Sequence, residues 1–314
     1  MLDVSKKVRT LRTATASASL KLRRETVELL RHNSIPKGDP LTVAKVAAVQ
    51  AAKNTSNLIP YCHPIHVDFV DCRFNVTDTR IEIETEVKAI DRTGVEMEAL
   101  CAATVAALTL YDMMKMLDET MEIGDVKLTG KKGGKSDFKD QFEVPLRAAV
   151  LVMSDSIASG KKKDLSGQLI VERLRKEGVD VVDYKIIPDD TEGIKQELIR
   201  YSDEMKVDLV VTTGGTGFSP RDFSPEATRE VLERLIPGIP EALRAYGQDR
   251  TPYSMLSRGI AGIRGTTLIA NLPGSKKGVA DSLDALFPAV LHSFKMLKGA
   301  GHEHRKKGAA RNES

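Results

Sequence analysis

The clearest pattern in the first half of the chain is a strict alternation of apolar and polar side chains over residues 80–90. Ile81, Ile83, Val87 and Ala89 occupy alternate positions, and charged residues fill most of the positions between them. A period of two places neighbouring side chains on opposite faces of a strand, so we predict a strand with one buried face. A strand over residues 67–76 precedes it, and the intervening turn predicts that the two form an antiparallel pair.

Helices are expected on both sides of this strand pair, over residues 24–32, 41–53 and 99–117. The second helix has a strong start signal, because Asp39 is favoured at the N-cap and Pro40 at the first helical position. Further strands are expected within residues 6–22 and at 123–129. Helices mixed with antiparallel strands predict an α+β fold for this half.

A different pattern begins after Pro145, where buried apolar runs alternate with helical segments. The strands are expected at 149–153, 179–187, 209–211 and 266–272, and the last helix at 278–296. This alternation predicts an α/β domain with a doubly wound, mostly parallel sheet. We therefore expect domains at 1–144 and 145–298, followed by a disordered basic tail at 299–314.

Residues that suit ligand binding follow four of these strands. The carboxyl ends of parallel strands meet at one sheet edge, so we expect these residues to form one site. Its expected binding residues are Ser154, Asp155, Thr213, Gly214, Gly215, Thr216, Gly217, Pro273, Gly274 and Ser275. The glycines bring backbone N–H groups close to an anion, and the threonines add hydroxyl donors. A glycine turn without a ligand is the alternative, and the segment lacks the lysine of a Walker loop.

Two carboxylates at this edge, Asp189 and Asp222, have the chemistry of metal ligands. Mg²⁺ is commonly held by one or two carboxylates together with substrate phosphates. We therefore predict that Asp189 and Asp222 hold Mg²⁺ beside a bound phosphate.

The first half contains charged residues that allow two interpretations each. Asp112 and Lys115 share a helix face. They could form a surface ion pair, or Lys115 could be an acid/base that the Asp112 carboxylate orients. Glu96 and Glu98 lie at a helix start, where carboxylates also complement the helix dipole. Lys131 lies in a loop of glycines and lysines, which suits polyphosphate or a solvated basic loop.

Lys37 and the turn that contains His63 give weaker indications of a functional site. Lys37 precedes the helix start at Pro40, where an anion is favoured, although a lone loop lysine is commonly only solvated. Cys62, His63 and His66 lie in a proline-framed turn. They offer one thiol and two imidazoles without a second ligand pair, so we prefer a hydrogen-bonding or acid/base role for His63 over a zinc site.

Composition narrows the function classes. The chain has 314 residues and a net charge of only +3, and its aromatic content of 4% includes no Trp. This argues against nucleic-acid binding. Three cysteines suit reduced thiols. We find no signal peptide and no apolar run that would span a membrane, so we expect a cytoplasmic protein without a membrane partner.

The first half resembles the cyclic pyranopterin monophosphate synthase family over residues 2–143. The segments that carry the likeness are KGDPLTVAKVAAVQAAK, LIPYCHPI, TGVEMEALCAATVAALTLYDMMK and KKGGKSDF. The resemblance implies a ferredoxin-like, homo-oligomeric protein that converts a cyclised GTP intermediate to cyclic pyranopterin monophosphate and pyrophosphate. It places the active-site residues at Lys37, His63, Glu96, Glu98, Asp112, Lys115 and Lys131. The family loop reads KSGGKSG, whereas this chain has Lys132 for Ser and one glycine fewer.

The second half resembles molybdopterin adenylyltransferase over residues 147–298. The matching segments are SDS…DLSG, IPDD, TTGGTGFSPRDFSPEAT and NLPGSKKG. The resemblance implies transfer of AMP from Mg-ATP to molybdopterin, with Asp189 and Asp222 as the acids and no tightly bound organic cofactor. Together the two halves imply a bifunctional enzyme of molybdenum cofactor biosynthesis.

Two other functions compete for the second half. It could bind and carry molybdopterin without catalysis, beside an active first half. It could also be a general nucleotide-binding regulator, which would bind ATP whether or not pterin is present. The presence of both Asp189 and Asp222 favours the enzyme.

Overall fold

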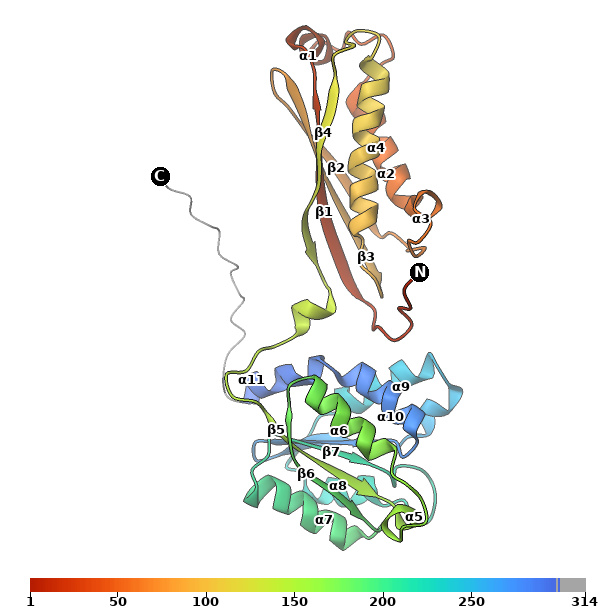
Figure 1. Cartoon of the computed structure of the whole chain (residues 1–314), viewed down its shortest axis with the longest axis vertical. Coiled ribbons are helices and arrows are strands. Elements are labelled where there is room, and N and C mark those ends of the chain that lie inside the picture. The colour runs from red at the N-terminus through yellow and green to blue at the C-terminus, as the bar shows by residue number, and fades with distance from the viewer. Residues whose placement is uncertain (298, 300–314) are drawn as a thin grey trace. The chain divides into compact units, whose positions relative to one another are not determined.

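The computed structural model describes residues 1–297 and 299, and the chain divides into two compact units, Met1–Asp137 and Phe138–Ser314 (Figure 1). The predicted tail at 299–314 lies outside the described residues except for Gly299. Each unit is described by itself below.

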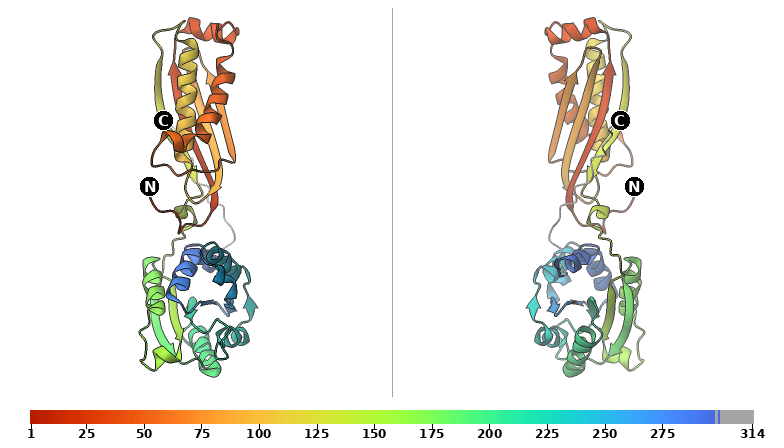
Figure 2. Two further views of the ribbon diagram at one scale, coloured as in Figure 1. Left: turned by 90° about the vertical axis from the view of Figure 1, so that its right-hand side faces the viewer. Right: turned by 90° about the vertical axis from the view of Figure 1, so that its left-hand side faces the viewer.

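The first unit is a four-stranded antiparallel sheet with helices on one face. Its strand order is β2-β3-β1-β4, and every neighbouring pair is antiparallel. Helices α2 and α4 lie in front of the strands in one view of Figure 2 and behind them in the other. The elements are β1 (Thr10–Lys21), α1 (Arg24–Arg31), α2 (Pro40–Lys53), α3 (Thr55–Leu58), β2 (Phe69–Val76), β3 (Arg80–Asp91), α4 (Glu96–Met114), β4 (Glu122–Lys132) and the 3₁₀ turn η1 (Lys135–Phe138).

The predicted period of two decides which face of this sheet is buried. Ile81, Ile83, Val87 and Ala89 of β3 are all buried, as are alternate residues of β1. The strand pair and the α+β class are therefore confirmed. The start of α2 is confirmed as well, since the Asp39 carboxylate accepts hydrogen bonds from the first-turn N–H groups.

Helix α4 corrects one expectation from the sequence. It is long and apolar enough to cross a membrane by length and composition, contrary to our prediction that no such run exists. Half of its apolar window is buried inside the unit. Its alanines, including Ala99, Ala103 and Ala107, are fully buried and pack in the same core as the strands. Small side chains let a helix approach a sheet closely, which accounts for the composition.

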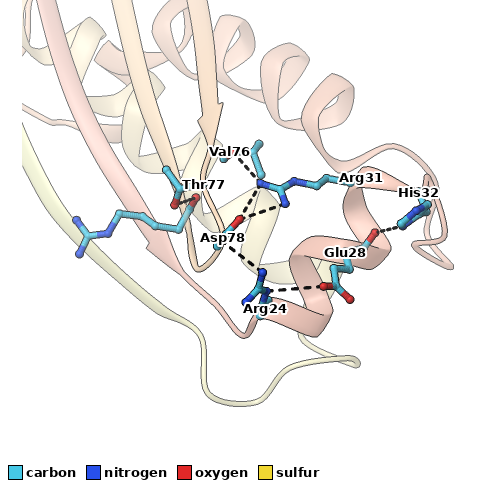
Figure 3. A network of polar contacts seen from close by, with 8 residues as sticks. Arg24, Glu28, Arg31, His32, Val76, Thr77 and Asp78 are labelled. Atoms are coloured by element: carbon cyan, nitrogen blue, oxygen red, sulfur yellow. Dashed lines mark hydrogen bonds and ion pairs between the residues drawn. The ribbon is translucent and has the colours of Figure 1, made fainter.

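The turn between β2 and β3 is tied to helix α1 (Figure 3). Asp78 in this turn forms an ion pair with Arg24, at 3.7 Å, and accepts a hydrogen bond from Arg31, at 3.3 Å. Arg31 also donates to the carbonyl of Val76, and Thr77 closes the turn by donating to Arg80 O. These exposed contacts fix the end of the sheet opposite to the N-terminal arm.

The second unit is a six-stranded sheet of order β6-β5-β7-β10-β9-β8, with helices on both faces (Figure 1). Strands β6, β5, β7 and β10 are parallel, and β9 and β8 add an antiparallel edge. The elements are β5 (Arg147–Met153), α5 (Asp155–Ala158), α6 (Ser166–Lys176), β6 (Asp180–Ile187), α7 (Thr191–Ile199), the π turn η2 (Arg200–Glu204), β7 (Leu209–Thr213), α8 (Ser224–Val231), β8 (Arg234–Leu235), α9 (Gly238–Gln248), η3 (Pro252–Leu256), β9 (Ala261–Arg264), β10 (Thr267–Leu272), α10 (Lys276–Leu286), η4 (Ala289–His292) and α11 (Ser293–Leu297).

Two separate cores lie on the two faces of this sheet. Val150 and Val211 belong to the core beneath α6 and α10, whereas Leu151 and Val210 belong to the core beneath α7 and α8. Neighbouring residues of a strand thus serve opposite faces, so the strands read as continuous apolar runs. The prediction of an α/β unit with a mostly parallel sheet is confirmed.

Three local details differ from the predictions. The helix expected at 278–296 ends at Leu286, because Pro288 lacks the N–H that a continuing helix needs. The antiparallel edge strands β8 and β9 are short and were not predicted. The segment that precedes β5 packs with the second unit, where Asp140 pairs with His292 at 2.8 Å.

Candidate functional sites

The first candidate site joins the start of α2 to the end of α4. Lys37 precedes the N-cap of α2, and its Nζ lies 2.9 Å from Asp112 Oδ2 and donates to the Asp112 carbonyl at 2.8 Å. Lys115, at the end of α4, places its Nζ 2.8 Å from Asp112 Oδ1. One carboxylate therefore holds two ammonium groups, and we call these three residues the lysine pair site.

The charges of this site act on one another. The hydrogen bonds from Lys115 and Lys37 lower the pKa of Asp112 to about 2, so this carboxylate is ionised at neutral pH. Asp112 in turn raises the pKa of Lys115. Lys115 is therefore a protonated cation near pH 7, and it can neutralise a phosphate or donate a proton.

The remaining predicted residues of the first unit lie around the start of α4. Lys131, near the end of β4, places its Nζ 3.5 Å from Glu96 Oε1. His63 Nε2 lies 2.9 Å from the carbonyl of Leu2. Glu98 is buried, and burial raises its pKa to about 7. A protonatable carboxyl in an apolar environment is an arrangement found at acid/base sites.

Helix α4 keeps these two groups of residues apart. Glu96 and Asp112 are separated by 16 positions, which is roughly 24 Å along a helix that rises about 1.5 Å per residue. One copy of the chain brings together Lys37, Asp112 and Lys115 at one end of α4, and Glu96 and Lys131 at the other. A single copy therefore does not assemble all seven predicted residues into one site.

Burial of Glu98 predicts a pH-dependent stability for the first unit. Its folded pKa of about 7 lies above the ordinary 4.5, so the folded state binds this proton more tightly than the unfolded chain. That stabilisation is complete below pH 4.5 and is lost as the pH rises through about 7. Glu98→Gln removes the titration, and its stability relative to the parent should rise by a few kcal/mol between these pH values.

Hydrogen exchange of peptides from α4, corrected for intrinsic rates and compared at pH 5 and pH 8, measures this difference. Glu28→Gln on α1 is the control, since its side chain is 59% exposed. A difference between Glu98→Gln and the parent that stays constant with pH would contradict the predicted titration.

The second candidate site lies at the carboxyl ends of β5, β6 and β7. The backbone N–H of Asp155 donates to Asp189 Oδ2 at 3.3 Å, and the N–H of Asp189 donates to Asp155 Oδ1 at 3.2 Å. Arg221, from the loop after β7, places Nη2 2.8 Å from Asp155 Oδ2. The structure therefore brings together residues that follow three different strands, and we call this group the acidic edge.

The glycines after β7 allow the backbone to pass through a narrow space. Gly214 has φ +101°, and a Cβ there would lie 2.1 Å from the carbonyl oxygen of Met153. Gly215 has φ +60°, and a Cβ there would meet Ser224 Oγ at 2.2 Å and Asp189 Oδ1 at 3.1 Å. Ser224 also donates to Gly214 O, so it tethers this turn to α8 instead of capping that helix.

Two threonine hydroxyls of this segment make hydrogen bonds within the second unit. Thr213 is buried and donates to the carbonyl of Pro273 at 2.6 Å, and Thr212 accepts from Asn271. These hydroxyls connect β7 to β10 and to Pro273, which follows β10. Ser275 is likewise engaged, because its Oγ accepts from Gly278 N as the N-cap of α10. The backbone of the loop remains the part that can face an anion.

The acidic edge has the chemistry to complete a magnesium site. Asp189 Oδ1 is buried and has no hydrogen-bond partner among the described residues. Burial, with the charges of Asp155 and Asp222 nearby, raises the pKa of Asp189. In the part of the chain that the structure describes, no three His, Cys, Asp or Glu side chains can hold a metal by themselves. The residues fit Mg²⁺ held by one or two carboxylates, with phosphate oxygens and waters as the other ligands.

Arg258 was missed in the sequence analysis. It follows η3, and its Nε donates to the carbonyl of Gly217 at 2.6 Å. Nothing near Arg258 in the sequence indicates this contact, because its partner is 41 residues away. Only the packing of the segment before β9 beside the glycine loop brings the two together.

Replacing Gly214 with alanine should destabilise the second unit by about 3 kcal/mol, because the added Cβ needs both an unfavourable φ and the space that Met153 O occupies. Gly160→Ala is the matched control, with φ +73° but no heavy atom within 4 Å of its Cβ among the described residues. We expect that variant to lose about 1 kcal/mol. Urea unfolding followed by circular dichroism compares them, and equal losses would refute the close approach at Gly214.

Comparisons with known proteins agree with the division of the chain into two units. The model of the MoaC family matches residues 1–134, and the model described as a probable molybdopterin binding domain matches residues 149–292. A molybdenum cofactor biosynthesis bifunctional protein of Chlorobaculum tepidum is 44% identical over 302 residues, which cover 96% of each chain. A protein of the same description from Synechococcus elongatus is 36% identical, over 96% of this chain and 98% of its own. The cyclic pyranopterin monophosphate synthase of Desulfitobacterium hafniense is 51% identical over 43% of this chain and 84% of its own.

Proposed function

We propose, from the premise that the chain belongs to the molybdenum cofactor biosynthesis bifunctional proteins, that each unit has its own active site and catalyses a separate step of that pathway. The two candidate sites support this proposal, because each is built from residues of one unit alone.

The first unit would convert the cyclised GTP intermediate to cyclic pyranopterin monophosphate and pyrophosphate. The lysine pair site is the observation that carries this proposal. Lys37 and Lys115 provide two cations for a triphosphate, and Asp112 orients both ammonium groups. Lys115, which is protonated at neutral pH and oriented by Asp112, would donate a proton during the ring rearrangement. His63, Glu96, Glu98 and Lys131 would serve the same reaction from the other end of α4.

The separation along α4 supports a homo-oligomer. Because the two groups of predicted residues lie roughly 24 Å apart in one copy, a second copy would supply the group that the first lacks. The element order β1-α2-β2-β3-α4-β4, with sheet order β2-β3-β1-β4, supports a ferredoxin-like fold for each copy.

The second unit would transfer AMP from Mg-ATP to molybdopterin. An oxygen of the molybdopterin phosphate would attack the α-phosphorus of ATP, forming a new P–O bond while pyrophosphate leaves. Asp189 and Asp222 would hold Mg²⁺, which neutralises phosphate charge when bound. The backbone of the glycine loop would bind and orient the phosphates, and Arg221 would balance the charge of Asp155. The partnerless Asp189 Oδ1 is the observation that carries this proposal.

Assays of both reactions on the full-length chain test the proposal. The cyclised GTP intermediate should yield cyclic pyranopterin monophosphate with one pyrophosphate per turnover. Molybdopterin with Mg-ATP should yield adenylylated molybdopterin, and removing Mg²⁺ with a chelator should stop only this second reaction. Molybdopterin binding without AMP transfer would identify the second unit as a carrier, and ATP binding that is indifferent to pterin would identify a nucleotide-binding regulator.

A further inference from the structure

We infer that Arg258 is a positioning residue for the acidic edge: its guanidinium holds residues 216–222 in the curve that places the Asp222 carboxylate beside the glycine loop. The inference deepens the proposed function of the second unit and rests on it. It assigns a role to a side chain that lies outside every segment in which we predicted site residues.

Three hydrogen bonds connect Arg258 to this curve, and an ion pair connects its guanidinium to α8. Its Nε donates to Gly217 O at 2.6 Å, and its Nη2 donates to the carbonyl of Asp222. Its Nη1 pairs with Glu226 on α8. Its backbone N–H donates to Thr216 O at 3.0 Å. One planar group therefore fixes both ends of the segment, and the carboxylate of Glu226 fixes that group in turn.

The segment between these anchor points has few other means of support. Phe218, Ser219, Pro220 and Arg221 are all exposed, so burial contributes little to their order. Within the segment, Ser219 N donates to Asp222 Oδ2 at 2.7 Å, which aims the carboxylate relative to its own turn. The position of that turn relative to the rest of the site depends on the contacts with Arg258 and on the ion pair between the exposed Arg221 and Asp155.

The glycine loop shows why this position matters. A Cβ on Gly217 would lie 2.9 Å from Asp222 Oδ2, and a Cβ on Gly215 would lie 3.1 Å from Asp189 Oδ1. The two acids thus flank the same short stretch of backbone. A shift of the 217–222 segment would move Asp222 away from Asp189, and a metal ion would lose one of its two carboxylates.

The geometry requires an arginine. Its fork reaches two carbonyls and a carboxylate at once, which the single ammonium of lysine cannot do. Three of the five N–H donors of the guanidinium are engaged within the protein, and two of these three bonds hold the backbone of residues 217–222, so Arg258 acts on the site through Asp222.

The test uses the full-length chain and Mn²⁺ as a paramagnetic probe. Titration of free Mn²⁺ by electron paramagnetic resonance should show about tenfold weaker binding to Arg258→Ala, which corresponds to about 1.4 kcal/mol. Arg258→Lys should be weakened to a similar extent. Added guanidinium ion at millimolar concentration should restore much of the binding to Arg258→Ala. In Arg258→Ala the KM for Mg-ATP should rise while kcat changes much less, since saturating Mg-ATP still fills the metal site.

Arg264→Lys is the matched control. Arg264 lies on β9, away from the loop, and pairs with Asp203 of η2 at 2.6 Å. Its Mn²⁺ affinity should equal that of the parent. Parent-like Mn²⁺ affinity in Arg258→Ala would overturn the inference. A second result would also overturn it: Arg258→Ala loses Mn²⁺ and molybdopterin binding equally, its Tm falls, and guanidinium does not restore binding. That combination indicates general unfolding. If the parent binds Mn²⁺ but transfers no AMP, the proposed function fails while the Mn²⁺ comparison still decides the role of Arg258.

Discussion

Replacing Lys115 with alanine is expected to lower the formation of cyclic pyranopterin monophosphate by about 10²–10⁴-fold, the range that a positioned acid/base group contributes. Lys115 forms a 2.8 Å ion pair with Asp112, which raises its pKa, so its ammonium group is protonated near neutral pH. Its side chain is 57% exposed, so its loss should leave the fold intact. AMP transfer by the second unit should be unchanged, which provides an internal control in the same sample.

Two further variants define what Lys115 contributes. Lys115→Arg keeps the positive charge and the pairing with Asp112, but a guanidinium does not release its proton. If Lys115 moves a proton, the arginine variant should be nearly as inactive as the alanine variant. If Lys115 only neutralises phosphate, Arg should preserve most of the rate. Lys45→Ala on α2 is the control, since Lys45 is 54% exposed and pairs with Asp71 at 3.3 Å in the same unit. Near-normal turnover of Lys115→Ala would remove this residue from the mechanism.

Asp189→Asn is expected to lower AMP transfer to molybdopterin by about 10²-fold or more, without loss of stability. Its Oδ1 is buried without a partner among the described residues, and an incoming cation would satisfy it. An asparagine can keep the hydrogen bond that Asp155 N gives to Oδ2, but it has no negative charge for the metal.

The stability of Asp189→Asn distinguishes a role of Asp189 in metal binding from a structural role. Burial raises the pKa of Asp189, so the folded protein holds the proton more tightly than the unfolded chain does. Stability from this group is complete below its unfolded pKa and falls as the pH rises through the folded pKa. The neutral asparagine avoids that loss, and the variant should be at least as stable as the parent at pH 8. A structural role predicts the opposite, with activity and Tm falling together.

The neighbouring Asp190 is the matched control. Its carboxylate accepts from Gly193 N at 2.7 Å as the N-cap of α7, and asparagine serves equally well at that position. Asp190→Asn should therefore keep both the stability and the AMP transfer of the parent. Near-normal transfer by Asp189→Asn, measured as adenylylated molybdopterin formed at saturating Mg-ATP, would move the metal ligand elsewhere.

The sequence by itself determined the elements whose signals are local. The period of two in residues 80–90 fixed both the strand β3 and its buried face, because side-chain direction alternates within a few residues. Asp39 and Pro40 marked the start of α2, since capping involves only adjacent N–H groups. The order of strands and helices after Pro145 was enough to place Asp155 and Asp189 at one sheet edge.

Only the tertiary structure decided which side chains meet across long sequence separations. Lys37 contacts Asp112 over 75 positions because the start of α2 lies beside the end of α4. The length of α4 itself separates Glu96 from Asp112, although the two were assigned to one site. The contacts of Thr213 and Arg258 were decided in the same way, since their partners come from the residue after β10 and from the loop after β7. Periodicity, caps and turns depend on residues within about four positions, whereas these contacts depend on how whole elements pack, which no local pattern specifies.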